Sequence, residues 1–240
     1  MLSFTVNGNS MGDESINTKK AAGEKAAEYI QPGMTVGLGT GSTAYWAIQA
    51  IGARVNQGLG IKAVATSAKS EMLGKELGID IISFADIDHI DITIDGADEV
   101  SENLDLIKGG GGALLREKIV GYATRQYIII ADYKKYVKTL GAFALPVEVV
   151  KFGWEMTIRH LQKLGCTTKT RIRDEESFIT ENGNYIIDCS FVAIKEPTVL
   201  YQQINAIPGV VENGLFLQMA DIVVLGEADG STRILTRNEV

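Results

Sequence analysis

Three short segments of this 240-residue chain combine glycines with hydroxyl, acidic or basic side chains. Glycine lets a backbone approach a ligand closely, because it has no Cβ. Carboxylates can accept or move protons, and a lysine can stabilise charge that develops on a reacting oxygen. Each segment also fits an ordinary structural role. The segments are Gly39-Thr40-Gly41-Ser42-Thr43, Asp95-Gly96-Ala97-Asp98 and Lys108-Gly109-Gly110-Gly111, which continues to Arg116-Glu117-Lys118.

The first segment lies between an apolar run at 34–38 and a predicted helix. Free amides at a helix start, with the hydroxyls of Ser42 and Thr43, would make a phosphate cradle. The segment is not a P-loop, since no Gly-Lys-Ser/Thr follows. It also lacks the dinucleotide fingerprint, because position 42 is serine where the third glycine would stand. A tight turn with Ser42 as the helix N-cap explains the pattern equally well.

The second segment places Asp95 and Asp98 directly after the short strand predicted for 92–94. Ligands of open α/β sheets bind at the carboxyl ends of the strands. Carboxylates there could bind sugar hydroxyls, move a proton during ring opening or hold a divalent metal. Asp-Gly is also a common turn pair, and for an arbitrary protein a plain turn is the favoured interpretation.

The third segment places Lys108 before four consecutive glycines at the start of a predicted helix. A cation beside bare amides is well suited to stabilise an oxyanion. Helical periodicity puts Leu115, Ile119 and Tyr122 on one face and Glu117 on roughly the opposite side. Periodicity alone therefore predicts that Glu117 is a solvated surface residue.

Strands and helices alternate along residues 18–131, as in a parallel sheet with helices on both faces. After Leu145-Pro146 the order becomes strand, helix, strand, strand, helix, strand, which is the βαββαβ pattern of ferredoxin-like domains. Helices are predicted over 18–29, 42–55, 69–77, 113–124, 154–164 and 198–207. Strands are predicted over 34–38, 61–66, 80–83, 92–94, 127–131, 147–150, 168–172, 185–189, 210–213 and 222–225.

The predicted fold class is α/β, a Rossmann-like, mostly parallel sheet domain with a second, smaller α+β domain. The first domain is expected to span 1–144 and 216–240, because the run at 222–225 should rejoin the first sheet. The smaller domain is expected at 145–215. Residues 1–16 are polar and are expected to form a loose extension, with Met11 as an alternative start.

The composition limits the classes of partner and cofactor. A net charge of -7 argues against nucleic acid, which is bound through an excess of Lys and Arg. The only two cysteines cannot build a disulfide framework or a four-ligand zinc site, and His89 and His160 are isolated. We therefore expect no metal and no cofactor. No secretion signal and no run of about 18 apolar residues occurs, so a cytoplasmic location without membrane insertion is expected.

In order and spacing, the three segments resemble ribose-5-phosphate isomerase A. The resemblance extends from about Thr18 through Leu145-Pro146-Val147-Glu148-Val149, Ala206-Ile207-Pro208-Gly209-Val210 and Gly214-Leu215-Phe216. It implies an aldose-ketose isomerase of the pentose phosphate pathway. Such an enzyme interconverts D-ribose 5-phosphate and D-ribulose 5-phosphate through an enediolate, as a homodimer or homotetramer.

The same resemblance implies a role for each site residue. Glu117 would be the catalytic base, Lys108 would stabilise the enediolate, and Asp95 and Asp98 would handle the hydroxyl protons. Which aspartate opens the ring stays open. Ser42, Thr43 and Lys135 would hold the phosphate together with Lys19, although Lys20 could serve equally. The substrate-binding residues implied are Thr40, Gly41, Ser42, Thr43, Asp95, Gly96, Ala97, Asp98, Lys108, Gly109, Gly110, Gly111, Lys135 and Lys19.

Two other classes of protein fit parts of the pattern. A non-catalytic sugar-phosphate-binding module would need only the cradle and the carboxylate turn, although nothing resembles an attached DNA-reading helix pair. An acyl or coenzyme A transferase on a similar sheet could use Glu117 as a nucleophile.

Overall fold

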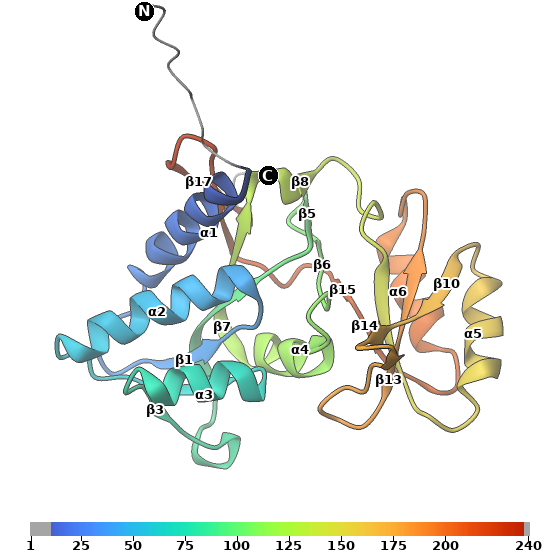
Figure 1. Ribbon diagram of the computed structural model, residues 1–240, viewed down its shortest axis with the longest axis horizontal. Coiled ribbons are helices and arrows are strands. Elements are labelled where there is room, and N and C mark those ends of the chain that lie inside the picture. The colour runs from blue at the N-terminus through green and yellow to red at the C-terminus, as the bar shows by residue number, and fades with distance from the viewer. Residues whose placement is uncertain (1–10, 238–240) are drawn as a thin grey trace, which may run out of the picture.

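The structure is a computed structural model that describes residues 11–237, with side chains from residue 14. Its largest sheet has the strand order β17-β16-β7-β4-β1-β2-β3 and is parallel except for the edge strand β17 (Figure 1). The run predicted at 222–225 joins this sheet beside β7, as expected. The strands are β1 (Thr35–Leu38), β2 (Lys62–Ala65), β3 (Asp80–Ile81), β4 (Ile90–Gly96), β7 (Thr124–Asp132), β16 (Ile222–Gly226) and β17 (Thr232–Thr236).

Alternate residues of the central strands pack on opposite faces of this sheet, as strand geometry requires. Ile128 and Ile130 of β7 share a core with α1 (Met11–Ala27), α2 (Ser42–Asn56) and, at its edge, α3 (Ala68–Glu76). Tyr127 and Ile129 pack with residues 97–106 on the other face. The hydrophobic runs are therefore buried on both sides, and the carboxyl ends of the strands are left for a site.

The second face of the sheet carries a feature that the sequence did not predict. A small sheet in the order β15-β6-β5-β8 covers it, together with one helix, α4 (Leu114–Tyr122). The expectation of helices on both faces is therefore only partly met. These strands have two or three residues each, too few for a hydrophobic period to show. They are β5 (Glu99–Ser101), β6 (Leu106–Ile107), β8 (Tyr136–Val137) and β15 (Leu215–Phe216).

The βαββαβ segment forms an antiparallel sheet in the order β10-β13-β9-β14, and its hydrophobic core under two helices also includes Ile107 and Leu215 of the small sheet. This confirms the predicted pattern, while the domain boundaries stay a prediction. A short hairpin of β11 (Ile172–Arg173) and β12 (Glu176–Ser177) was not predicted. The elements are β9 (Leu145–Val149), α5 (Trp154–Gln162), β10 (Thr167–Thr170), β13 (Tyr185–Ser190), α6 (Pro197–Asn205) and β14 (Val210–Asn213).

The predicted loose extension is wrong for residues 11–16, which belong to α1. Glu14 accepts hydrogen bonds from Tyr133 Oη at 3.2 Å and Lys134 Nζ at 3.0 Å. Buried Thr18 donates to Asp132 Oδ2 at 2.6 Å. Polar contacts with the end of β7 and with the 3-10 helix that follows it, rather than an apolar stripe, hold this end of the helix. The rest of the expected extension, residues 1–10, lies outside the described residues.

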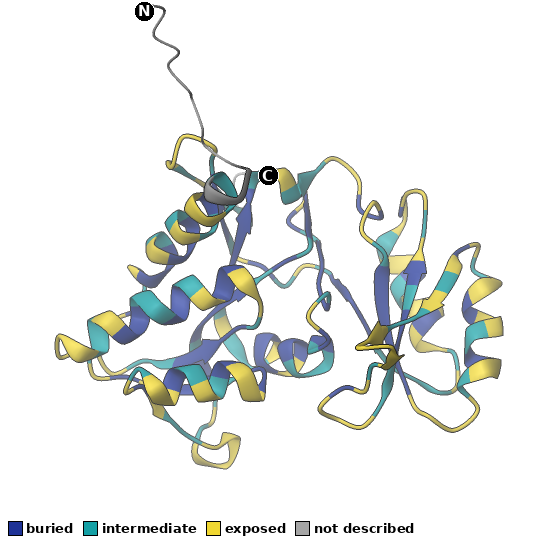
Figure 2. Cartoon of the chain, viewed as in Figure 1, coloured by how far each residue is buried: buried dark blue, intermediate teal, exposed yellow. Residues whose placement is uncertain are grey.

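The burial pattern matches these layers. Figure 2 shows buried strands through the centre of the larger sheet and exposed outer faces on the helices around it. Among residues 11–237, no helix has the length and apolar character needed to cross a membrane.

Candidate active site

The three chemistry-bearing segments meet in one cavity of about 240 Å³ at the carboxyl ends of β1 and β4. Almost every predicted site residue lines it. Asp95 lies behind the wall, and Lys19 is not part of the lining. The lining residues are Thr40, Gly41, Ser42, Thr43, Gly96, Ala97, Asp98, Lys108, Gly109, Gly110, Gly111, Glu117 and Lys135.

The first glycine segment leaves the hydroxyls of Ser42 and Thr43 available to the cavity. The N-cap of α2 is Gly41, without a side-chain hydrogen bond, and Ser42 is the first helical residue. The N-cap role considered for Ser42 is therefore wrong, because the left-handed backbone of Gly41 (φ 112°) makes the turn by itself. Thr40 is fixed by hydroxyl hydrogen bonds to Thr66 at 2.7 Å and Ser67 at 2.8 Å.

Asp95 and Asp98 have different surroundings. Asp95 is fully buried and accepts from Thr40 N at 3.0 Å, Gly96 N at 2.8 Å and Tyr127 Oη at 3.1 Å. Burial raises the pKa of Tyr127, so its hydroxyl stays protonated and donates to Asp95. These three donors fix the position of the Asp95 side chain behind the cavity.

Asp98, in contrast, lines the cavity, and Oδ2 accepts from Gly110 N at 2.7 Å. A Cβ at position 110 would lie 2.6 Å from Asp98 Oδ1, so only glycine permits this approach. The glycine-rich sequence is thus explained by contact with a carboxylate as well as by an exposed backbone.

Lys108 is the cation at the centre of the site, with only 2% of its surface exposed. Nζ lies 2.8 Å from Asp95 Oδ2 and 3.4 Å from Glu117 Oε1, and it also donates to Gly96 O. Burial favours the neutral amine, but the Asp95 and Glu117 carboxylates outweigh it and raise the pKa of Lys108. A charged ammonium is therefore fixed at the cavity wall.

Glu117 lies in the first turn of α4 and is only 4% exposed. Oε2 has no hydrogen-bond partner among the described residues. Burial raises the pKa of Glu117 to about 8, against the opposing effect of Lys108 and with smaller contributions from Asp95 and Asp98. The prediction of a solvated surface residue is wrong. The helix turns Glu117 towards the cavity, and its apolar residues Ile119 and Tyr122 are 52% and 89% exposed.

Lys135 closes the cavity from the short 3-10 helix η2 (Tyr133–Lys135) and donates to Ala97 O at 2.5 Å. Burial lowers the pKa of Lys135 against the pull of Asp98, and Lys19 and Lys108 lower it further. Lys19 is thus close enough to act on Lys135, although it does not line the cavity. Lys20 is engaged elsewhere, 3.8 Å from Glu24 and above the ring of Trp46.

Two supporting residues were missed by the sequence analysis. Tyr127, which orients Asp95, could have been found, since its place in a buried strand puts a hydroxyl in the core. Arg171 left no signal in the sequence. Nη1 donates to Gly109 O at 2.7 Å and Gly110 O at 3.2 Å, and the guanidinium pairs with Asp188. The smaller sheet thereby holds the glycine loop of the larger one.

Lys118, next to Glu117, makes a second connection between the sheets. Nζ donates to Asn213 O at 2.7 Å and Leu215 O at 2.9 Å and pairs with Glu212 at 2.9 Å. Within residues 11–237, no group of three His, Cys, Asp or Glu residues is arranged to hold a metal.

The fold and the cavity together define a class of protein. A buried carboxylate with a free oxygen, a fixed ammonium and exposed glycine amides supply a base and an oxyanion site. This is the arrangement of an α/β enzyme that moves protons on a small polar substrate.

The comparisons with known proteins define the family. Residues 62–230 match the model of ribose 5-phosphate isomerase A (phosphoriboisomerase A). The chain is 51% identical to ribose-5-phosphate isomerase A of Bacillus mycoides over 90% of its own length and 98% of that protein. A corresponding protein of Oceanobacillus iheyensis is 49% identical over 90% and 97%. The chain therefore belongs to the ribose 5-phosphate isomerase A family and is an isomerase.

Solved structures agree with this family and with the predicted fold class. Ribose 5-phosphate isomerase from Plasmodium falciparum superposes with a TM-score of 0.88 at 38% identity, covering 93% of this chain and 98% of that one. A D-ribose-5-phosphate isomerase in complex with phospho-erythronic acid also gives 0.88 at 38% identity, covering 91% and 97%. The binding-module and transferase alternatives are set aside.

Proposed function

We propose that the chain interconverts D-ribose 5-phosphate and D-ribulose 5-phosphate, a step of the pentose phosphate pathway, with Glu117 as the base. The observation that carries the proposal is that Oε2 of Glu117 has no partner among the described residues and lies next to the Lys108 ammonium in a glycine-lined cavity. The cavity lies just below the usual range of about 300–1,000 Å³ for small-molecule sites, which suits a five-carbon phosphate.

In the proposed reaction, Glu117 takes the proton from C2 of the open-chain aldose. The electron pair forms the C1–C2 double bond of an enediolate, and the charge that develops on the former carbonyl oxygen O1 is stabilised by Lys108 and the glycine amides. Glu117 returns the proton to C1, while the proton of the C2 hydroxyl passes to O1, which leaves a ketone at C2 and a hydroxyl at C1. A pKa near 8 suits a group that must accept and release a proton near neutral pH.

The other predicted residues have supporting roles in the proposal. Asp98 faces the cavity and is the better placed of the two aspartates to exchange hydroxyl protons and open the ring. Asp95 acts through Lys108, which it holds at 2.8 Å. The phosphate would lie against Ser42, Thr43 and Lys135, with Lys19 adding positive charge at longer range.

The Glu117→Gln variant tests the assignment of the base. The substitution keeps the shape and removes the proton acceptor, so turnover should fall by about 10²–10⁴-fold while folding and binding of ribose 5-phosphate persist. Exchange of the C2 proton with deuterated solvent, followed by NMR, isolates the transfer step and should also be lost. Glu148→Gln, the same change at another buried glutamate, is the matched control. Wild-type exchange in a folded Glu117→Gln protein would falsify the assignment.

We further propose a cytoplasmic homodimer or homotetramer. Both cysteines are buried free thiols, which suits a reducing compartment. The exposed apolar residues Ile119 and Tyr122 on α4 offer a surface that a second subunit could cover. Light scattering of the purified protein measures the number of subunits, and a monomer at micromolar concentration would contradict the proposal.

A further inference from the structure

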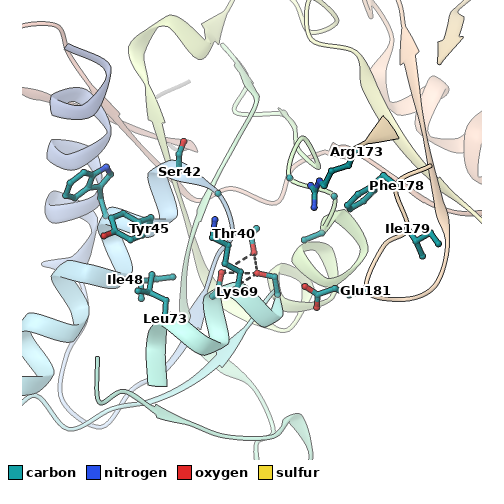
Figure 3. Close-up of a pocket in the computed structure, with 17 residues that line it drawn as sticks. Thr40, Ser42, Tyr45, Ile48, Lys69, Leu73, Arg173, Phe178, Ile179 and Glu181 are labelled. Carbon is teal, nitrogen blue, oxygen red and sulfur yellow. Dashed lines mark hydrogen bonds between the residues drawn. The ribbon is translucent and has the colours of Figure 1, made fainter. Parts of the chain in front are cut away.

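A second, larger pocket lies beside the catalytic cavity (Figure 3). Its volume is about 710 Å³, and it shares Thr40, Gly41, Ser42 and Gly111 with the smaller cavity. Helices α2 and α3 form one wall, and the segment from Arg173 to Glu181 forms the other. This pocket is about three times larger than the cavity assigned to the sugar phosphate.

The walls of this pocket are suited to a flat apolar group. Tyr45, Trp46 and Leu73 line it from the two helices, and Phe178 and Ile179 line it from the opposite side. Aromatic side chains gain most by stacking on another ring or on a broad apolar surface. A polyhydroxylated sugar phosphate would leave most of this surface unused.

The charges in the pocket favour an anion. Lys69 and Arg173 extend from opposite walls, and neither has a carboxylate partner among the described residues (Figure 3). The Arg173 guanidinium stacks on Phe178, 4.3 Å from the ring centre. Glu181, the one acidic residue of the lining, pairs with Arg116 and accepts from Ala68 N at 3.0 Å. Two uncompensated cations thus line one pocket of a chain with net charge -7.

We propose that this pocket is a second ligand site, which takes a planar aromatic anion. The ring would lie between α2 and the Phe178–Ile179 wall, with its anionic group between Lys69 and Arg173. Because the pocket shares Thr40 to Ser42 with the catalytic cavity, a bound ligand displaces or obstructs the substrate. The expected competition with the substrate rests on the proposed function. Binding of the aromatic anion does not depend on it.

The direct test is titration with 2-naphthoate, followed by the fluorescence of Trp46 in a Trp154→Phe background. We expect saturable binding at one site per chain. Arg173→Gln and Lys69→Gln should each weaken it by about threefold to tenfold, the range for a partly screened charged contact. Arg159→Gln is the matched control, since Arg159 is an exposed arginine on α5 that lines neither pocket. Equal loss in the control would overturn the proposal.

Further arms separate the sources of binding. The neutral 2-naphthalenemethanol and the small anion acetate should each bind at least tenfold more weakly than 2-naphthoate. Equal affinity for the neutral ring would refute the anion site. Binding lost in Lys135→Ala but kept in Arg173→Gln would place the probe in the catalytic cavity. Affinity that falls as protein concentration rises would mean that a second copy covers the pocket, which also overturns the proposal.

In assays, 2-naphthoate should raise the apparent KM for ribose 5-phosphate without lowering kcat, and Arg173→Gln should reduce this effect.

Discussion

Glu117 and Glu148 are both buried glutamates, and Oε2 of each has no hydrogen-bond partner among the described residues. Their surroundings differ. Glu117 has an ammonium 3.4 Å away and opens onto a cavity. Glu148 lines neither pocket, and Oε1 accepts from Thr180 Oγ1 at 2.9 Å, Asn182 Nδ2 at 3.2 Å and Asn184 Nδ2 at 2.8 Å. A buried carboxylate oxygen without a hydrogen-bond partner therefore does not by itself identify a catalytic residue.

The neutral donors around Glu148 indicate a structural role. They come from the turn at 180–184, where Gly183 N donates to Thr180 O before β13 begins. Glu148 on β9 thus fixes the turn that carries Glu181 towards Arg116. The contrast predicts that changes near Glu117 affect rate, whereas changes at Glu148 affect stability.

After the loss of the base itself in Glu117→Gln, the largest effect is expected for Lys108→Gln. Removing a fixed oxyanion donor costs about 10²–10³-fold in kcat. Asp95 keeps its bonds from Thr40 N, Gly96 N and Tyr127 Oη, so the variant should still fold. Steady-state kinetics with a thermal melt checks both points. A folded variant with wild-type kcat would show that Glu117 needs no cation and would remove the main difference between the two glutamates.

The pH dependence of kcat/KM sharpens the comparison further. Because burial raises the pKa of Glu117 to about 8 and the base must be deprotonated, kcat/KM should rise about tenfold per pH unit up to about pH 8 and then level off. With an ordinary glutamate pKa, the profile would be flat from pH 6 to 8. A limb near pH 6 would instead belong to the substrate phosphate, whose second pKa is about 6. Glu148→Gln should leave the limb in place.

The smallest effect on rate, with a clear effect on stability, is expected for Glu148→Ala. The buried Thr180 hydroxyl and the amides of Asn182 and Asn184, which are less buried, lose their acceptor, which costs about 1–3 kcal/mol of unfolding free energy. Turnover should stay within about twofold of wild type. Urea denaturation and kinetics on the same preparation measure the two quantities. A large loss of kcat without a loss of stability would bring Glu148 into the chemistry.

Much of the site could be predicted from sequence, because its residues lie in three glycine-bearing segments. Thr40 to Thr43, Gly96 to Asp98 and Lys108 to Gly111 line one cavity, as the family resemblance implied. The sequence could not show that Asp95 would lie behind the cavity wall while Asp98 lines the cavity. It depends on which carboxylate receives the donors of Thr40 and Tyr127, which are distant in sequence.

The orientation of α4 was the main error, and its cause is physical. Periodicity identifies an apolar face but not what covers it, and here Ile119 and Tyr122 face outward while Glu117 and Lys118 are buried. On the buried face of α4, where apolar residues would be expected, Glu117 faces the cavity and Lys118 donates to the carbonyls of Asn213 and Leu215. The small sheet on the second face was missed because its strands are too short to show a pattern.

The contact of Arg171 with Gly109 and Gly110 links the two larger sheets thermodynamically. Arg171 follows β10 of the smaller sheet, and the oxygens that it binds belong to the loop that completes the cavity. The loop therefore loses these two hydrogen bonds once the smaller sheet unfolds. A ligand that needs the ordered loop must in turn stabilise the distant sheet by mass action. Unfolding of either part is then coupled to the other, and heat should melt the chain as one cooperative unit.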